Sequence, residues 1–488
     1  MTRFKKTHAV VVGGGITGLA AAYYLVQKAS QKKLPLTITL LEREKQLGGK
    51  IKTRRQDGFI IEQGPDSFLR RKPAVIQLSQ ELGLDKAWVP TGPLASRTYI
   101  VHQGELHPLP GGMMFGIPIR WKPFLKTGLI SPWGKARALF DLFLPKQLVD
   151  KDESLGHFLR RRLGHQVVER ITEPLLSGIY AGDLYALSLQ ATFPQFKALE
   201  EKYGSLIRGM KNSQQQAQPQ QTDQNIPNST FLSFQNGLFS LVEALKARLE
   251  NSVQFRLSTA VHAISKTDDG YTLLLNQGET LKADLLILAT PAYVTANLFE
   301  EQALQRKLEE IPYISVANVV LAFDQHPPDV HLDASGFLVP RKEKFTLTAS
   351  TWTSSKWPHT APQGKVLIRA YLGRDGEEHL LEKEDQELVD LVRKELKQLT
   401  GLNQAPSFWM VNRWPRSMPQ YQVGHLERLQ FIAQFLHQHY PGVFLAGAGY
   451  RGVGIPDCIA QGEEAANQAV NFLEKQDKSP NKAIPTTP

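Results

Sequence analysis

Glycines at a fixed spacing near the start of the chain are the first residues whose types could do chemistry. Gly13, Gly15 and Gly18 form the pattern G-x-G-x-x-G, with an apolar run before it and a helical pattern after it. Such glycines permit a tight turn, a close approach of the backbone to a diphosphate, and close packing of the helix on the strand. Free N–H groups and the dipole at a helix N-terminus stabilise negative charge. The pattern therefore predicts a dinucleotide site.

An acidic residue supports this interpretation. Glu42 directly follows the next apolar run, residues 36–41. A carboxylate at the end of the second strand of such a unit can accept hydrogen bonds from the ribose hydroxyls of adenosine. The acidic residue and the glycines together favour a bound dinucleotide over a turn without a ligand.

Later segments resemble the other cofactor motifs of the amine-oxidase-like flavoprotein superfamily. Residues 42–50 resemble its second diphosphate motif, although Lys50 stands where many members carry Arg, which leaves a point charge in place of a bidentate contact. Residues 283–291 resemble its internal strand motif, and Val261 lies on a preceding strand, positioned to contact the adenine. Residues 445–447 and 452–456 resemble its C-terminal motif, which brings a helix N-terminus to the flavin ring. Four motifs in this order predict FAD rather than NAD.

The elements around these motifs predict an α/β fold. Strands are expected over residues 9–12 and 36–41, with a helix over 17–29 between them. The apolar run 285–289 is expected to be a buried parallel strand. A last strand over 443–446 is expected to lead through glycines into a helix over 459–473.

The middle of the chain has a different pattern. Residues 111–210 are helical in pattern with Pro and Gly interruptions, whereas residues 311–408 are rich in strand patterns, with one charged helix near 382–399. Residues 212–229 are rich in Gln, Asn and Ser and predict a flexible polar loop.

Composition limits the classes of function. The 488 residues carry 57 Lys and Arg against 47 Asp and Glu, a net charge of +10, which favours acidic partners. No nucleic-acid-binding motif appears, and the basic clusters at residues 70–72 and 160–162 are interpreted as solvated faces. The single Cys458 excludes an internal disulfide and is interpreted as a small buried residue. Residues 9–26 resemble a secretory signal, but their glycines favour a strand and a turn, so a cytoplasmic enzyme is expected.

With these motifs in view, the chain resembles the coproporphyrinogen III oxidases of Gram-positive bacteria, which have long been grouped with protoporphyrinogen oxidases. The resemblance runs from about Val10 to Leu473. Its most specific stretches are GPDSF at 64–68, EPLLSGIYAGD at 173–183, TFPQF at 192–196, SMPQY at 417–421 and GVGIPD at 452–457.

The resemblance implies a Rossmann-like FAD-binding domain, an antiparallel-sheet substrate domain and an inserted helical domain. The expected division is 1–75, 235–300 and 420–475 for the FAD-binding domain, 76–110 and 301–419 for the substrate domain, 111–211 for the helical domain, 212–229 for the loop and 476–488 for a disordered tail.

The resemblance also implies the site. The residues to which it assigns FAD contacts are Gly13, Gly14, Gly15, Ile16, Thr17, Gly18, Glu42, Arg43, Gly49, Lys50, Gly64, Pro65, Asp66, Ser67, Val261, Trp414, Gly452, Val453, Gly454 and Ile455. The implied reaction, part of haem biosynthesis, removes six electrons from a porphyrinogen in three steps. Hydride passes from a bridging carbon to flavin N5. Dioxygen then reoxidises the flavin and is reduced to hydrogen peroxide. No catalytic side chain and no metal site are expected.

Coproporphyrinogen carries four propionates, so its pocket needs cations around an apolar disc. Lys72, with Arg71 beside it, follows the stretch that the family places near the flavin and is the expected propionate contact. Ile179 and Tyr180 are expected to line the cavity wall.

Three other functions stay open. Protoporphyrinogen oxidation differs only in two vinyl groups on the substrate. A flavin amine oxidase is disfavoured because Cys458 lies past the position used for covalent flavin attachment. A non-catalytic binding protein of the GDP-dissociation-inhibitor type shares the fold without FAD. Product hand-off to a ferrochelatase, peripheral contact with a membrane and the oligomeric state are also left open.

Overall fold

The computed structural model describes residues 7–147, 151–216, 226–328 and 330–478. Half of the predicted polar loop, residues 217–225, and most of the predicted tail, residues 479–488, lie outside these ranges. Among the described helices, none is long and apolar enough to cross a bilayer.

A five-stranded sheet in the order β12-β2-β1-β16-β22 carries the glycine-rich turn. All four neighbouring pairs are parallel, and the sheet joins segments from the two ends and the middle of the chain. Val10 and Val11 of the central strand are fully buried, as expected for a strand covered on both faces. The strands are β1 (Thr7–Val12), β2 (Leu36–Leu41), β12 (Val253–Arg256), β16 (Leu285–Leu288) and β22 (Val443–Leu445).

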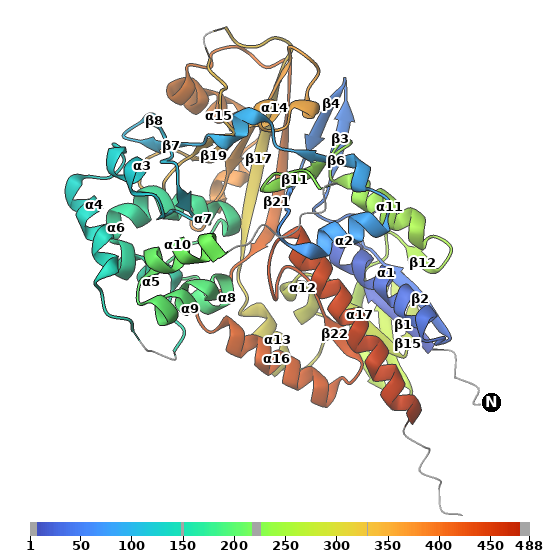
Figure 1. The fold of residues 1–488 in the computed structure, drawn as a ribbon. Helices are drawn as coiled ribbons and strands as arrows, with labels where there is room; N and C mark the ends of the chain where they lie inside the picture. The colour runs from blue at the N-terminus through green and yellow to red at the C-terminus, as the bar shows by residue number, and fades with distance from the viewer. Residues whose placement is uncertain (1–6, 148–150, 217–225, 329, 479–488) are drawn as a thin grey trace, which may run out of the picture.

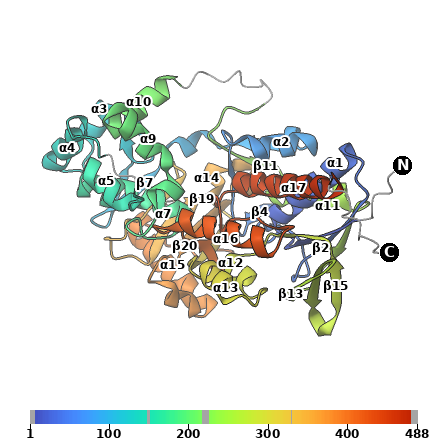
Figure 2. The ribbon, with the colours of Figure 1, turned by 90° about the horizontal axis from the view of Figure 1, so that it is seen from below.

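Two helices cover one face of this sheet. They are α1 (Ile16–Gln31) and α17 (Ile455–Lys478), and they lie side by side in both views (Figures 1 and 2). A Cβ at Gly462 would come within 2.5 Å of the Thr17 carbonyl oxygen, so the two backbones are nearly in contact. The packing of this helix pair therefore depends on small residues at the crossing. The observed start of α17 lies four residues before the expected one.

Smaller elements surround the parallel sheet. The neighbours of α1 and α17 are α2 (Pro73–Glu81) and α11 (Phe239–Leu249). The other face is covered by α12 (Ala292–Ala296), α13 (Gln302–Glu309), α16 (His425–His439) and a three-stranded sheet of β13 (Val261–Thr267), β14 (Gly270–Leu275) and β15 (Thr280–Ala283). Two further small sheets are present. One contains β3 (Thr53–Gln56) and β4 (Phe59–Glu62), and the other contains β5 (Phe68–Leu69), β6 (Trp88–Pro90) and β11 (Phe231–Phe234).

A second, mainly antiparallel sheet has seven strands in the order β21-β17-β20-β19-β18-β7-β8. The charged helix expected near residues 382–399 is α15 (Asp385–Thr400), and its apolar side packs on this sheet. The strands are β7 (Tyr99–His102), β8 (Glu105–Pro108), β17 (Tyr313–Phe323), β18 (Gly336–Leu338), β19 (Leu347–Trp352), β20 (Val366–Leu372) and β21 (Phe408–Pro419), and the short α14 (Thr353–Lys356) follows β19.

The stretch predicted to be helical forms a separate unit at one end of the molecule (Figure 1). We call residues 119–147 and 151–216 the helical unit. The prediction missed one hairpin before it, β9 (Met113–Met114) with β10 (Ile117–Pro118), and α10 continues to Gln216, past the expected start of the loop. The helices are α3 (Trp121–Lys126), α4 (Pro132–Leu139), α5 (Leu155–Leu163), α6 (His165–Val167), a π-helix over Val168–Thr172, α7 (Glu173–Tyr180), α8 (Leu189–Thr192), α9 (Pro194–Tyr203) and α10 (Leu206–Gln216). The α/β class with an antiparallel sheet and a helical insertion is confirmed.

A buried cation ties the helical unit together, and the interpretation of residues 160–162 as a solvated face was wrong here. The Arg162 side chain is fully buried and forms ion pairs with Asp141 and Glu200, while its third guanidinium nitrogen donates to the Gly204 carbonyl at 2.8 Å. Arg160 is exposed. Charge alone could not reveal this difference, because it depends on which face of α5 meets the two carboxylates.

We therefore predict that Arg162→Met lowers the free energy of unfolding by about 3 to 5 kcal/mol, since it leaves the buried Asp141 carboxylate without its cation, whereas Glu200 keeps its ion pair with Arg161 at 2.6 Å. Urea unfolding of the flavin-loaded protein, followed by circular dichroism, measures this change. Arg160→Met is the matched control and should shift stability by less than about 0.5 kcal/mol. Equal midpoints for the two variants would contradict the assignment.

Candidate functional site: a dinucleotide cradle joined to a cavity wall

The first glycine-rich turn is closed at two positions and open at the third. Gly13 has a φ of +106°, and a Cβ at Gly18 would lie 1.9 Å from the Gly13 carbonyl oxygen, so neither position accepts a side chain. A Cβ at Gly15 would instead meet only the Gly49 Cα, at 4.0 Å. The space in front of Gly15, at the N-terminus of α1, is where the glycine pattern requires the diphosphate.

The second glycine pair closes the other side of this space. The Gly48 amide donates to the Gly14 carbonyl at 2.8 Å, and Gly49 has a φ of +58°. Residues 13–15 and 48–49 therefore form a cradle made of backbone, in which a diphosphate can approach N–H groups without meeting side chains.

Glu42 lies beside the cradle, as expected for a ribose contact. Its carboxylate accepts the Gly14 amide at 2.7 Å and the Glu44 amide at 2.8 Å. A carboxylate has about four acceptor positions, so two are available to ribose hydroxyls. The Thr259 amide donates to the Glu42 carbonyl at 2.8 Å, which brings the segment before Val261 to the same end of the site. The Arg43 guanidinium extends into solvent and pairs with Glu44 at 3.2 Å.

Lys50 supplies a cation on the inner side of the cradle. Lys50 is exposed as a residue, while its ammonium group lies among protein atoms and donates to the Ser417 carbonyl on β21; within the described chain it has no carboxylate partner. Burial lowers the pKa of Lys50 to about 8. An anion placed next to the ammonium would raise this pKa again, so the residue fits a diphosphate ligand.

The Gly64–Ser67 segment leads from β4 toward the second sheet. A Cβ at Gly64 would come within 2.0 Å of the Lys50 carbonyl oxygen and 3.6 Å of the Trp414 ring. The Trp414 indole donates to the Gln63 carbonyl at 2.9 Å. These contacts bring the predicted Gly64, Lys50 and Trp414 together, although they lie far apart in the sequence.

The carboxylate of Asp66 is occupied by protein cations. Lys356 lies 3.0 Å from it and Arg369 lies 3.9 Å from it. Although burial alone would raise the pKa of Asp66, these two cations and the Ser67 hydroxyl bring it well below its usual range. The side chain of Asp66 therefore holds the segment against the second sheet, and contact with a flavin is left to the backbone here.

The C-terminal motif forms the loop that precedes α17. Gly452 has a φ of +103°, and its amide donates to the Tyr421 hydroxyl at 2.8 Å. That hydroxyl donates in turn to the Ala448 carbonyl at 2.5 Å, so one side chain clamps both ends of the loop. The Tyr421 ring stacks on the buried His425 at 4.3 Å, and burial lowers the pKa of this histidine to about 4. Neutral His425 thus supports the clamp by packing.

The remaining predicted cofactor residues lie at the start of α1 and in the loop that leads into α17. Ile16 and Thr17 begin α1, and Thr17 is buried beside Cys458 of α17. Burial raises the pKa of Cys458 to about 11, in keeping with a packing role. Val453 packs against the core of the helical unit.

The predicted substrate residues lie where the helical unit approaches α17. The Lys72 ammonium contacts both carboxylate oxygens of Asp457, at 2.5 and 2.6 Å. Tyr180 is buried, and its ring lies 5.8 Å from that of Tyr421. The pKa of Tyr180 is raised by burial and, to a smaller extent, by the charge of Asp457.

The two other predicted substrate residues are more open. Ile179 is exposed, and the guanidinium of Arg71 lies 5.7 Å from the centre of the Phe115 ring, next to the helical unit. Arg71 and Lys72 therefore face in different directions, and Lys72 alone points to the C-terminal glycine loop.

Sequence reasoning missed two kinds of contributor. Lys356 and Arg369, which hold Asp66, lie in segments without a motif, so no sequence signal was available. Tyr421 and Asp457 end two of the stretches quoted for the resemblance, and their position there was the available signal. Their roles became visible only when the partners across the fold were known.

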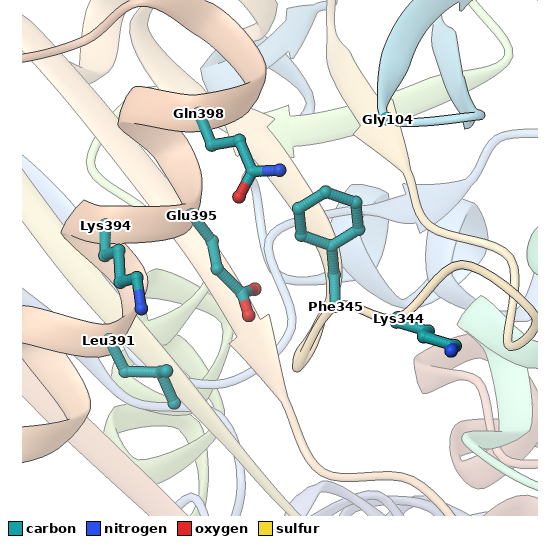
Figure 3. A pocket seen from close by; sticks show the side chains of 7 residues that line it. All are labelled: Gly104, Lys344, Phe345, Leu391, Lys394, Glu395 and Gln398. Carbon is teal, nitrogen blue, oxygen red and sulfur yellow. The ribbon is translucent and has the colours of Figure 1, made fainter.

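A hollow elsewhere on the molecule is not this site. It has a volume of about 320 Å³ and lies between α15 and the loops before β19 and between β7 and β8 (Figure 3). Its Glu395 accepts hydrogen bonds from the Thr346 and Leu347 amides, each at 2.9 Å, and so fixes the loop. No predicted site residue lines this hollow.

Comparisons with known proteins give the family. Residues 16–470 match the model of the family described as flavin containing amine oxidoreductase. The chain belongs to this family. Its cofactor is FAD, in agreement with the open cradle at Gly15 and the Lys50 ammonium beside it. The expectation of an oxidoreductase is confirmed.

Individual relatives narrow the grouping. Coproporphyrinogen III oxidase of Bacillus subtilis (strain 168) is 43% identical over 468 residues, 96% of this chain and 99% of the relative. The enzyme of the same name from Staphylococcus aureus (strain NCTC 8325 / PS 47) is 41% identical over 95% of this chain and 99% of its own. A crystal structure from Exiguobacterium sp. 255-15 superposes with a TM-score of 0.86 at 37% identity, covering 97% of this chain and all of the other. The resemblance to coproporphyrinogen III oxidases is confirmed.

The cradle yields a direct prediction. Gly15 has a φ of −71°, which any residue adopts, so Gly15→Val should fold while its side chain fills the space of the diphosphate. We expect flavin occupancy to fall at least about tenfold, measured from the visible absorbance of purified protein. Gly111→Val, in open space on the surface, should keep full flavin. Full occupancy in Gly15→Val would contradict the placement of the diphosphate.

Proposed function

We propose that this protein oxidises coproporphyrinogen III to coproporphyrin III in haem biosynthesis, with three dioxygen molecules consumed and three hydrogen peroxide molecules released. FAD supplies the acceptor for each two-electron step. The protein supplies placement, shielding from water and charge.

The observation that carries this proposal is the level of similarity over nearly the whole chain. The two Gram-positive coproporphyrinogen III oxidases match at 43% and 41% identity, whereas protoporphyrinogen oxidase 1 of Arabidopsis thaliana matches at 32% over 96% of this chain and 89% of its own. Protoporphyrinogen IX oxidation is therefore the second candidate. A flavin amine oxidase and a GDP-dissociation-inhibitor-like binding protein rank below both.

The aromatic side chains of the helical unit next to the glycine loop suit a flat, largely apolar macrocycle. Tyr180 and Phe193 pack edge to face at 6.5 Å, and the Tyr180 carbonyl accepts the Gln420 side-chain amide at 2.7 Å. Gln420 precedes Tyr421, which clamps the flavin loop. The same two residues thus fix the distance between the wall and the loop, and this fixed spacing is what orientation of a substrate against a cofactor requires.

The expected contact between Lys72 and a propionate has to take a protein carboxylate into account, which the sequence did not indicate. Because Asp457 already holds Lys72, a propionate has to share or displace that carboxylate. The ion pair is partly exposed, so the exchange is inexpensive. In this proposal Lys72 binds one propionate, and Arg71 attracts the tetracarboxylate from outside the cavity.

We extend the proposal to the product and the location. Coproporphyrin III is an acidic macrocycle and would pass to a ferrochelatase, in a cytoplasmic setting with peripheral membrane contact. The net charge of +10 favours acidic partners and surfaces of this kind.

The proposed reaction is tested with the purified flavin-loaded protein by steady-state oxidation of coproporphyrinogen III and protoporphyrinogen IX side by side, followed by porphyrin fluorescence. We expect kcat/KM to be at least about tenfold higher for coproporphyrinogen, because two more carboxylates contribute charge-assisted contacts. Equal or reversed values would favour protoporphyrinogen, and turnover of neither would remove the proposal.

Lys72 gives a sharper prediction. Lys72→Ala should lower kcat/KM for coproporphyrinogen III by the equivalent of about 1 to 3 kcal/mol, the range for a charge-assisted hydrogen bond, with bound flavin unchanged. Asp457→Asn should raise kcat/KM for coproporphyrinogen III at low ionic strength, where the ammonium freed from its ion pair attracts a propionate most strongly.

Arg160→Ala, which removes an exposed cation on the helical unit, is the control for general charge effects. If Lys72→Ala and Arg160→Ala have the same effect, then Lys72 acts only through net charge and not as a propionate contact.

A further inference from the structure

Three arginine side chains of the described chain are buried, and one of them lacks hydrogen-bond partners. The three are Arg162, Arg369 and Arg374, which are 0%, 1% and 5% exposed. Of these, Arg369 alone has buried guanidinium nitrogens without an acceptor, namely Nε and Nη1. Unpaired donors in a protein interior reduce stability, and a functional role is one reason for a protein to retain them.

Arg369 reaches from the antiparallel sheet to the cofactor side of the molecule. It lies on β20, and its Nη2 donates to the Gly64 carbonyl at 2.6 Å. Gly64 in turn packs against the Lys50 carbonyl at the border of the cradle. The cation is therefore attached to the chain segment that continues from the diphosphate site.

The two ends of the cradle give the direction of the dinucleotide. Glu42 has free acceptor positions for the adenosine ribose at one end. The other half of FAD has to leave the cradle on the opposite side, where Lys50 and Gly64 lie. The flavin ring is therefore expected next to the segment whose carbonyl Arg369 binds.

The charge of Arg369 is only partly compensated. The Asp66 carboxylate lies 3.9 Å from Arg369 but 3.0 Å from Lys356, so two cations share one carboxylate. Glu62 also interacts with Arg369, but burial raises the pKa of Glu62 to about 7, and its oxygens accept hydrogen bonds from a backbone amide and a hydroxyl instead. A net positive charge thus remains in the interior beside the Gly64 segment.

We propose that Arg369 sets the reduction potential of the flavin. A ring that takes a hydride gains two electrons and one proton, so its charge falls by one, and dioxygen later removes both electrons. An incompletely paired cation in a poorly screened interior stabilises this added charge. Arg369 is a positioning residue, because it acts on the ring through the Gly64 segment and through its field. The proposal does not depend on which porphyrinogen is oxidised.

The test uses the flavin-loaded protein without porphyrinogen. Sulfite adds to oxidised flavin and leaves a negative charge on the ring, so sulfite affinity and the midpoint potential report the same stabilisation. We expect Arg369→Met to bind sulfite at least about tenfold more weakly and to have a midpoint potential lower by about 30 mV, the two-electron equivalent of that factor. Both are measured at about pH 6, below the pKa of Glu62, so that Glu62 stays neutral; loss of Arg369 raises this pKa further.

The sign of the effect separates charge from structure. Asp66→Asn disturbs the same contact but removes a negative charge, so it should tighten sulfite binding and raise the potential. Arg369→Lys keeps the charge and should stay closer to the parent than Arg369→Met. The matched control is Arg374→Met, which removes a buried arginine just past β20 whose charge is paired with Glu377 at 2.8 Å, and it should behave like the parent.

Three outcomes would overturn the proposal. The first is a shift of Arg369→Met and Asp66→Asn in the same direction. The second is an unchanged sulfite affinity and potential in Arg369→Met, or an equal loss in Arg374→Met. If Arg369→Met does not fold with flavin, the third decides: no gain in sulfite affinity in Asp66→Asn. Substrate oxidation enters none of these measurements, so their failure is distinct from failure of the proposed reaction.

Discussion

The close approach of backbones around α1 determines where the rest of the site can lie. Gly18 packs against Gly13, and Gly462 packs against Thr17, with no room for a Cβ at either contact. These contacts press α1 against β1 on one side and α17 on the other. Because α1 starts at the diphosphate cradle and α17 starts at the loop opposite the substrate wall, the two helix N-termini are fixed relative to each other. Any larger residue at the crossing would separate the two halves of the cofactor site.

Much of this arrangement was predictable because glycines at a regular spacing indicate a specific structural or ligand-binding requirement. The strands β1, β2 and β16 and the helix α1 followed from apolar runs and turn glycines, and the cradle followed from residues 13–18 and 48–49. The burial of Arg162 was not predictable, because three adjacent arginines look alike until the face of the helix that meets Asp141 is known. The pairing of Lys72 with Asp457 was also hidden, since 385 residues separate the two in sequence. The local sequence pattern therefore predicted the helices and strands. The ion pairs between residues far apart in the sequence could not be predicted from it.

Charged and polar side chains, in addition to shared apolar clusters, join the three parts of the molecule. Asp66 of the parallel-sheet part is held by Lys356 and Arg369 of the antiparallel-sheet part. Gln420 reaches across to the Tyr180 carbonyl of the helical unit. Such contacts depend on direction as well as distance, so they fix orientation more tightly than apolar packing of the same size. A substrate between these parts would meet a cavity whose walls are already set.

Lys50 also affects the stability of the protein before FAD binds. The Lys50 ammonium has one carbonyl as its partner in the described chain, which is an unfavourable environment for a charge, and the pKa of about 8 expresses that cost. The bound diphosphate would relieve it, and a ligand that binds the folded state stabilises that state by mass action. Chains that lack their cofactor would therefore open more often around the cradle and would be cut first by cellular proteases.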